Sequence, residues 1–400
     1  MNPPQQALSD VRVLDLSDGV AGGYCARLLA DYGADVLKIE PPFHGDSSRK
    51  AGPFPDDLPN PETSGLHLHI NANKRGITLD ITQPAGREIL KRLVKDVDIL
   101  VEGFKPGHLA SLGLGYKDLE KLNPALVMLS ISPFGQTGPY KDFIATDAGV
   151  FAMSGRMYSH GQPDREPLPY ALDVIWYQVA VTAAAAGMGA LFAARVQAIG
   201  QQVDVSALEA LLGNVDNRPL FYEYTGNKTP RSKWPGGIPQ GAYPCADGYV
   251  VFGVGYDRYF RRLCDAMGRA DIYKDPRFAA NAERTRNAEA FEEIFLEWTL
   301  QHTKQEIFET CQAYRVMCAP INNWDDLMKD PQLVERGYFT RTEHPKAGSL
   351  PVTGAPAKMH GTPWSLRRPA PLLGQHNAEV YATLGYTTGD LARLRAHGVI

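Results

Sequence analysis

Between residues 11 and 131 the sequence alternates short apolar runs with runs of helical spacing, and this alternation constrains the fold more than any other feature. The runs with helical spacing lie at 21–31 and 88–94. Apolar strands separated by helices build βαβ units, so we expect an α/β fold whose sheet is mostly parallel and covered by helices. The runs expected to form its strands are 11–16, 35–39, 76–81, 98–102 and 125–131.

Ligands bind such sheets beyond the carboxyl ends of the strands. The first strand-end turn reads SDGVAGG, and its glycines would let a ligand approach backbone N–H groups at a helix start, a favourable place for a developing negative charge. The turn lacks the G-x-G-x-x-G spacing of dinucleotide sites, although Glu40 stands where a ribose-binding residue would lie. The turns expected at this edge are 17–23, 40–49, 80–83 and 102–107.

A single carboxylate, Asp173, precedes an uncharged, alanine-rich stretch that continues to residue 194. An ionised carboxyl group in apolar company loses hydration, and such groups are over-represented at reactive sites. The alternative is a helix N-cap, because Asp caps helices well. Residues 179–194 are too few for a membrane span, which needs about 20 residues, and Ala and Gly gain little from lipid, so we expect a buried core helix.

The composition changes after a helix-like run at 206–212. Residues 217–247 are rich in Gly, Pro, Tyr and basic side chains, and a strand at 248–253 with helices to about residue 315 is expected to follow. We therefore expect a large domain over 1–215 and a small domain over 225–325. The proline-rich segment 330–400 is expected to be extended chain that returns to the large domain or wraps a partner.

Charge and cysteine content exclude several classes of protein. The formal net charge of −4 shows no basic bias, which argues against nucleic acid as a partner. The five cysteines are odd in number and form no CxxC pair, which favours a cytoplasmic location. The first residues carry no charged head followed by an apolar run, so we expect no signal peptide.

Metal and hydrolase motifs have little support. His67 and His69 alternate in GLHLHI without Cys, Asp or Glu at matching spacing, so we expect a packed or solvated strand rather than a metal-binding pair. Neither G-x-S-x-G nor G-x-x-x-x-G-K-[ST] occurs, which argues against serine-hydrolase and P-loop chemistry.

Seven segments carry the pattern of a known family. They include NKRGITLDI at 73–81, VEGFKPGHLASLGLGY at 101–116 and LGQHNAEV at 373–380, and the others lie at 13–42, 122–140, 200–211 and 330–339. In this order and over nearly the whole chain, they resemble the class III coenzyme A-transferase family, which also contains the alpha-methylacyl-CoA racemases.

The resemblance implies a Rossmann-like large domain built from both chain ends, a smaller α+β domain, and an interlocked homodimer, with a heterodimer of paralogues also allowed. It implies a transferase that moves CoA from an acyl-CoA donor to a free carboxylic acid through aspartyl anhydride and aspartyl-CoA thioester intermediates. Coenzyme A would be a substrate, with no tightly bound cofactor and no metal. Neither nucleic acid nor a membrane is an expected partner.

The resemblance also assigns residues. Asp173 would be the catalytic nucleophile, and Gly236 and Gly237 would form a loop over the substrate. Relatives similar to formyl-CoA transferase have arginines where this chain has Pro41 and Ser111, so phosphate contacts would shift to Lys105, Arg75, Lys74 or Arg49. The residues expected near CoA are Val20 and Ala21 at the thioester, Leu79, Asp80, Ile81 and Thr82 around the adenine, Gly103, Phe104 and Lys105 along the phosphates, and Asp147 near the pantetheine end.

Two alternatives stay open. Racemases of this family carry a His-Asp pair where this chain has Thr146 and Asp147, and Thr146 cannot act as a base near pH 7, which favours a transferase over a racemase or isomerase. The other alternative is a non-enzymatic CoA-binding partner subunit, which the presence of Asp173 disfavours. Trp176 and Tyr177 suit an apolar or aromatic acyl group, or else pack in the core.

Overall fold

The computed structural model describes residues 6–213, 217–232 and 237–400, which form two compact units. Among the described residues, unit 1 comprises the chain up to Tyr158, Leu168–Lys228 and Glu335–Ile400. Unit 2 comprises Ser159–Pro167 and Thr229–Val334.

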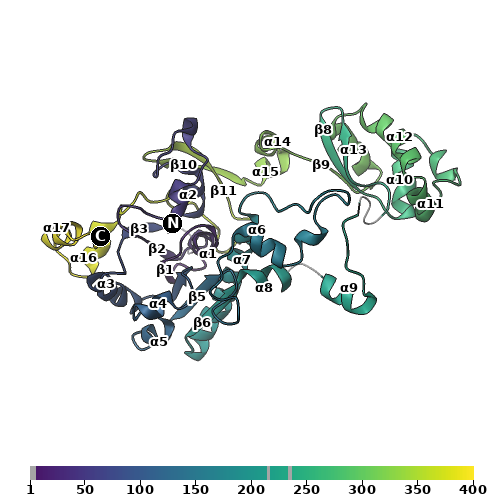
Figure 1. Cartoon of the computed structure of the whole chain (residues 1–400). Helices are drawn as coiled ribbons and strands as arrows, with labels where there is room; N and C mark the ends of the chain where they lie inside the picture. The colour runs from purple at the N-terminus through teal and green to yellow at the C-terminus, as the bar shows by residue number, and fades with distance from the viewer. Residues whose placement is uncertain (1–5, 214–216, 233–236) are drawn as a thin grey trace. The chain divides into compact units, whose positions relative to one another are not determined.

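Unit 1 is built on a six-stranded sheet in which every neighbouring pair of strands is parallel (Figure 1). The strand order is β3-β2-β1-β4-β5-β6, so the chain reverses its direction of winding between β1 and β4. The predicted α/β class with a parallel sheet is confirmed. The strands are β1 (Arg12–Asp15), β2 (Asp35–Glu40), β3 (Arg75–Thr78), β4 (Ile99–Glu102), β5 (Val127–Ser132) and β6 (Gln201–Ser206).

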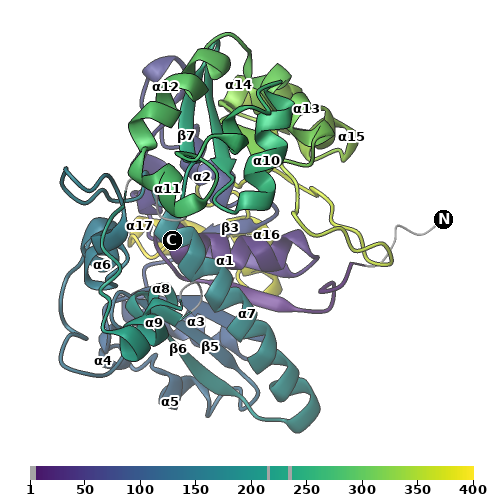
Figure 2. The ribbon, with the colours of Figure 1, turned by 90° about the vertical axis from the view of Figure 1, so that its right-hand side faces the viewer.

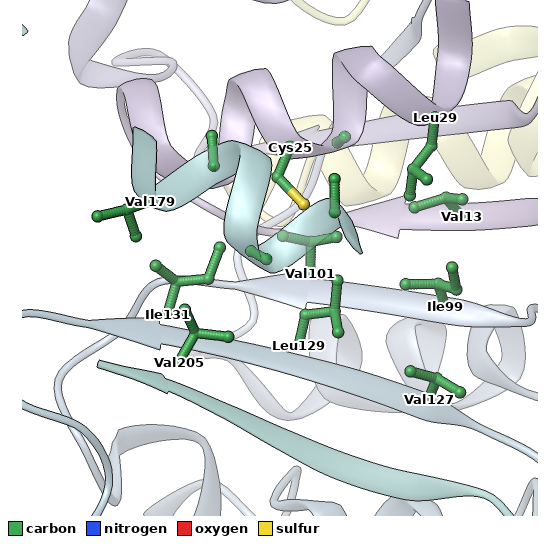
Figure 3. Packing of buried hydrophobic residues seen from close by; sticks show 14 of the residues in the cluster. Val13, Cys25, Leu29, Ile99, Val101, Val127, Leu129, Ile131, Val179 and Val205 are labelled. Atoms are coloured by element: carbon green, nitrogen blue, oxygen red, sulfur yellow. The ribbon is translucent and has the colours of Figure 1, made fainter. Parts of the chain in front are cut away.

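Alternate residues of the strands face two separate cores, because successive side chains in a strand point to opposite faces. On one face, Val13, Ile99 and Val101 pack under Cys25 and Leu29 of α1 (Val20–Asp31) (Figure 3). On that face α1 also packs against α7 (Val174–Gln197) (Figure 2). The smaller helices α6 (Asp147–Met153) and α8 (Ala207–Gly213) contact α7.

The other face of the sheet carries a second core, in which Leu14, Leu37 and Leu100 meet helices from both ends of the chain. The turn helices η1 (Ser47–Lys50), η2 (Pro55–Asp57) and η3 (Met157–Ser159), together with α2 (Gly65–Ile70) and α9 (Arg218–Thr225), complete the elements of this half of the chain. The helices of the second core are α3 (Pro84–Val94), α4 (His108–Ser111), α5 (Tyr116–Leu119), α16 (Asn377–Thr383) and α17 (Thr388–Ala396).

The alanine-rich helix α7 is buried on one face only, which corrects the prediction of a buried core helix. Gly187 lies against the sheet, where a Cβ would come 2.8 Å from Leu129 Cδ1. On the opposite face Val181, Phe192 and Val196 are 53%, 66% and 64% exposed. Within the described parts of the chain, α7 is the one helix whose length and composition would suit a membrane span, and 44% of its apolar window is buried inside the protein.

Residues 65–70 form the helix α2, so the predicted strand containing His67 and His69 is wrong. The Ser64 hydroxyl accepts a hydrogen bond from the His67 N–H and caps the helix, which the alternation of apolar and polar residues did not reveal. His67 is buried, and its Nδ1 lies 2.9 Å from Ser48 Oγ.

The C-terminal segment joins unit 1. Its hairpin, β10 (Phe339–His344) with β11 (Gly348–Thr353), is antiparallel. Further on, the Asn73 N–H donates to the Arg368 carbonyl, and the His376 N–H donates to the Gly76 carbonyl. Gly76 permits this approach, since a Cβ there would lie 2.8 Å from Pro371 Cγ.

Unit 2 has a three-stranded antiparallel sheet in the order β7 (Gln240–Cys245), β8 (Gly248–Gly253), β9 (Cys318–Pro320). The predicted strand at 248–253 is β8. The core of unit 2 is rich in aromatic side chains, and the rings of Phe291 and Phe295 stack with their centroids 5.4 Å apart. The helices are α10 (Asp257–Ala266), η4 (Ile272–Lys274), α11 (Asn281–Arg286), α12 (Ala288–Thr299), α13 (Lys304–Ala313), α14 (Trp324–Lys329) and α15 (Pro331–Glu335), the last of which ends at the first residue of unit 1.

Candidate active site

Asp173 stands at the N-cap position of α7, but its carboxyl group does not cap the helix. The carbonyl oxygen of Asp173 accepts the N–H groups of Trp176 and Tyr177, at 2.9 and 3.2 Å. Within the described residues, the Asp173 side chain makes no capping hydrogen bond to the helix. Asp173 therefore stands at the N-cap position, as the alternative predicted, but its carboxylate does not act as a cap. Asp173 is one of the residues that line a cavity.

The cavity beside Asp173, here called the Asp173 pocket, has a volume of about 420 Å³. It lies at the carboxyl ends of β1, β4 and β5, where the strand order reverses. Its lining residues are Asp18, Gly19, Val20, Ala21, Gly22, Ser47, Ser48, Ala51, Leu66, Gly103, Ile131, Ser132, Pro133, Ala145, Asp173 and Trp176.

A second cavity of about 570 Å³, here called the strand-end pocket, adjoins the first. The two pockets share Asp18, Ser47 and Gly103, so one groove runs from Asp173 across the ends of β1, β2, β3 and β4. The strand-end pocket is lined by Leu16, Ser17, Asp18, Lys38, Ile39, Glu40, Pro41, Gly45, Asp46, Ser47, Lys50, Leu79, Asp80, Ile81, Thr82, Gly103, Phe104, Lys105 and His108.

The start of α1 forms one wall of the Asp173 pocket. Gly19, at the N-cap position of α1, adopts a positive φ of 73° and has no side chain that could cap the helix. The first backbone N–H groups of a helix have no partner within the helix and carry partial positive charge, so Val20 and Ala21 can offer donors to an anion. Gly22 is needed in this wall, because a Cβ there would lie 2.2 Å from Ser17 Cβ.

The carboxyl groups of Asp173 and Asp147 interact, although Asp147, the first residue of α6, lines neither pocket. Partial burial raises the pKa of Asp173, and the charge of Asp147 raises it further. Burial and then the charge of Asp173 raise the pKa of Tyr177 to about 12. Thr146, which precedes Asp147, caps α6: its Oγ1 accepts a hydrogen bond from the Gly149 N–H at 3.3 Å.

Three of the four cations expected to bind phosphate line neither of the two pockets. Lys74 is fully buried and binds Asp15 Oδ2 at 2.8 Å. Arg49 is 1% exposed and pairs with Glu40. Arg75 begins β3, whereas the pockets lie beyond the strand ends, and it pairs with Asp35 and Glu379.

Lys105 does line the strand-end pocket, together with Lys50 and His108, which the sequence analysis did not single out. Lys105 is 65% exposed and lies 3.8 Å from Asp142. Lys50 ends η1, and His108 begins α4 with its ring 5.1 Å from that of Phe104. His108 follows Lys105 by three residues, a spacing that could have signalled a shared rim.

The remaining predicted residues divide as follows. Leu79, Asp80, Ile81, Thr82, Gly103 and Phe104 line the strand-end pocket. Trp176 lines the Asp173 pocket, whereas Tyr177 packs edge-on against Tyr24 with ring centroids 4.8 Å apart. Gly237 belongs to unit 2, where a Cβ would lie 2.2 Å from Asn281 Oδ1, and Gly236 lies outside the described residues. Over the described ranges, no group of three or more His, Cys, Asp or Glu could hold a metal ion.

Comparisons with known proteins identify relatives over the full length. The family model described as CoA-transferase family III matches residues 8–377. The chain is 35% identical to succinyl-CoA–D-citramalate CoA-transferase of Chloroflexus aurantiacus, over 99% of both chains. It is 33% identical to the BbsE subunit of succinyl-CoA:(R)-benzylsuccinate CoA-transferase of Thauera aromatica, over 99% of this chain and 98% of that one. A crystal structure of a CAIB/BAIF family protein from Brucella suis has a TM-score of 0.86 and 30% identity, covering 95% of this chain and 100% of that one.

Proposed function

Because this chain belongs to CoA-transferase family III, we propose that it moves CoA from an acyl-CoA donor to a free carboxylic acid through covalent intermediates on Asp173. The observation that carries the proposal is the Asp173 pocket, which is lined both by Asp173, whose carboxyl group does not cap α7, and by Val20 and Ala21 at the start of α1.

In the first half of the reaction the Asp173 carboxylate attacks the thioester carbonyl of the donor. The carbon–sulfur bond breaks, and a mixed anhydride and the CoA thiolate form. The thiolate then attacks the Asp173 carbonyl carbon of the anhydride. This step yields an aspartyl-CoA thioester and releases the donor as its free carboxylate.

In the second half the carboxylate of the acceptor attacks the aspartyl-CoA thioester and expels the thiolate. A second mixed anhydride forms, and the thiolate attacks its acceptor carbonyl to give the new acyl-CoA. Asp173 returns as a free carboxylate. The thioester bond is conserved, so neither ATP hydrolysis nor a tightly bound cofactor is required.

Each tetrahedral intermediate carries an oxyanion, and donors fixed before the reaction stabilise it most. We assign this role to the backbone N–H groups of Val20 and Ala21, which line the same pocket as Asp173. Gly236 and Gly237 stay proposed members of a loop that excludes water from the anhydride.

The strand-end pocket suits the nucleotide end of CoA. Leu79 and Ile81 offer an apolar surface for adenine, while Lys105 on the facing turn offers positive charge to phosphate. Lys50 and His108 add to this rim. Asp147, which raises the pKa of Asp173, suits the pantetheine end near the thioester.

We propose an interlocked homodimer, with a heterodimer of paralogues as the alternative, since one relative is named as a subunit. The exposed apolar face of α7 and the exposed Leu220 and Tyr224 of α9 support a large interface, because such surfaces mark association sites. We also propose a cytoplasmic location, which the five free and buried cysteines support.

The identity of the two acids is the open part of the proposal. One relative is named for succinyl-CoA and citramalate and another for succinyl-CoA and benzylsuccinate, so dicarboxylic acids belong in the first panel of candidate substrates. Trp176 at the Asp173 pocket supports testing aromatic acids beside them.

A panel of acyl-CoA donors crossed with free acids, read by mass spectrometry, tests the proposal. We expect exchange for at least one pair, and loss of more than a thousandfold in Asp173→Asn while CoA still binds, because Asn nearly preserves shape but is not a nucleophile. Solvent deuterium entering the α-carbon without acid exchange would establish a racemase instead. Exchange that appears only after a paralogue is added would establish a partner subunit.

A further inference from the structure

Two loops at the junction of the pockets hold each other reciprocally. Asp18, after β1, accepts the backbone N–H of Ser47 at 2.6 Å through Oδ1. Asp46, after β2, accepts the backbone N–H of Gly19 at 3.2 Å through Oδ1. Asp18 and Ser47 line both pockets. These four residues, Asp18, Gly19, Asp46 and Ser47, are here called the clamp.

Lys38 lies beneath the clamp and is fully buried. Its Nζ pairs with Asp46 Oδ2 at 2.7 Å and donates to the backbone carbonyl of Ser17. It also lies 3.6 Å from Asp15 Oδ1, the atom that accepts the Ser17 N–H at 3.1 Å. One ammonium group therefore ties both loops to the sheet, since it lies on β2 and reaches the turn after β1.

A second buried cation secures the far end of the same turn. Lys74 Nζ donates to the Gly23 carbonyl at 2.7 Å and pairs with Asp15 Oδ2 at 2.8 Å. The backbone from Ser17 to Gly23 is thus held at three points by charged groups that are themselves buried. Buried ion pairs contribute little to stability compared with apolar packing, and the contacts of these two cations fix the course of the turn after β1.

We propose that Lys38 is a positioning residue for the reaction at Asp173. Through Asp46 and the Ser17 carbonyl it fixes Gly19, and thereby the direction in which the N–H groups of Val20 and Ala21 point into the Asp173 pocket. A shift of about 1 Å in such donors costs on the order of a hundredfold in rate. The kinetic tests of this inference rest on the proposed function, because they measure CoA transfer, whereas the contacts of Lys38 do not depend on it.

The first test uses Lys38→Met and the double variant Lys38→Met/Asp46→Asn. Lys38→Met leaves the buried Asp46 carboxylate without a cation and Asp15 with Lys74 as its remaining ion-pair partner, and it is expected to lower thermal stability strongly. The double variant removes the charge of Asp46, and the amide oxygen of its new side chain can still accept the Gly19 N–H. We expect it to regain much of the melting temperature but to keep a kcat about 30- to 100-fold below that of the unmodified protein, with KM for acyl-CoA changed less than about threefold. A double variant that regains stability and kcat together would overturn the proposal.

Asp18 provides a test with little risk of misfolding, because its side chain is exposed. Asp18→Ala removes the acceptor of the Ser47 N–H and is expected to lower kcat at least tenfold, whereas Asp18→Asn keeps an acceptor and is expected to restore most of it. An equal loss of kcat in Asp18→Ala and Asp18→Asn would contradict the clamp, because it would show that the negative charge of Asp18 matters and its hydrogen bond does not. Asp390→Ala, which removes the carboxylate that accepts the Thr387 N–H in the capping box of α17, is the matched control.

Hydrogen exchange gives a readout that does not depend on transferase activity. In Lys38→Met/Asp46→Asn and in Asp18→Ala, backbone amides of peptides covering residues 17–23 are expected to exchange at least tenfold faster, with no change in α17. Unchanged exchange in this turn would overturn the proposal even if the protein transfers CoA. Faster exchange in a protein that transfers no CoA would sustain the clamp and reject the proposed function.

Discussion

Asp147, the first residue of α6, lies close enough to Asp173 for its negative charge to raise the pKa of the Asp173 carboxyl group above its usual value. Burial is the larger cause of the rise and Asp147 the second. A negative charge nearby disfavours ionisation of the Asp173 carboxyl group. Since the proposed nucleophile must be ionised, we expect the raised pKa of Asp173 to set the acidic limit of activity.

The pH profile of kcat/KM should reflect that pair. Activity is expected to fall as the pH drops through the raised pKa of Asp173, and Asp147→Asn should move this acidic limb to lower pH, because it removes the repelling charge but leaves the burial. Asp118→Asn on α5, a residue that lines neither pocket, is the control. If the acidic limb lies at the same pH in Asp147→Asn, the group that titrates there is not Asp173.

The buried His67 should make the protein less stable in mild acid. Burial and then the charge of Arg49 lower its pKa to about 3, against a usual value of 6.5. Between these values the unfolded chain binds a proton that the folded protein does not, so stability is fully present above about pH 6.5 and is lost as the pH falls toward 3.

Urea unfolding at pH 7, 6 and 5 measures this loss. His67→Gln should flatten the dependence by up to about 1.4 kcal/mol per pH unit. His69, whose pKa burial and then Arg27 lower to about 4, should account for a further part. The exposed His360→Gln should leave the slope unchanged, and a slope that His67→Gln does not alter would contradict the burial of a neutral imidazole.

Two helical glycines should respond oppositely to alanine. Gly22→Ala places a Cβ 2.2 Å from Ser17 Cβ, so we expect a loss of about 1–3 kcal/mol in unfolding free energy and slower transfer as the turn shifts. Gly189→Ala on α7 meets nothing within 4 Å and should be neutral or stabilising by about 0.5–1 kcal/mol. Equal stability of both variants in urea would show that the turn after β1 relaxes freely.

Assembly is testable by dilution. If two chains interlock, their apolar surfaces are covered only in the dimer, and no stable folded monomer exists. Light scattering down to nanomolar concentration should then give about twice the chain mass of 43.9 kDa throughout. A well-folded, active monomer at the lowest concentration would exclude the interlocked dimer.

The sheet could be predicted from the sequence where its strands are apolar, and less well at its edge. Buried runs such as 35–39 predicted β2 nearly to the residue, because burial on both faces leaves a continuous apolar signal. The edge strand β6 was missed because Gln201, Gln202 and Asp204 interrupt that signal. Residues 65–70 were wrongly predicted as a strand because a helix of six residues is too short to show a helical period.

The location of the site could be predicted from the sequence, but which charged side chains line it could not. The four expected turns, after β1, β2, β3 and β4, all contribute lining residues to the two pockets, since parallel strands bring their carboxyl ends to one edge. Burial of a charged side chain has no local sequence signal, so Lys74 and Arg49 were expected to be ligands although both lie inside ion pairs. For the same reason the clamp and Lys38 were not predicted.

Trapping of the activated Asp173 carboxyl group as a hydroxamate tests the central claim most directly. The protein is incubated with an acyl-CoA that it accepts and with hydroxylamine, which converts an aspartyl anhydride or thioester into a hydroxamate, and its peptides are then mapped by mass spectrometry. The account predicts inactivation that requires both reagents, with the hydroxamate on Asp173 and none on Asp147 or Asp18. A label on another residue, or continued CoA transfer with Asp173 unmodified, would contradict it.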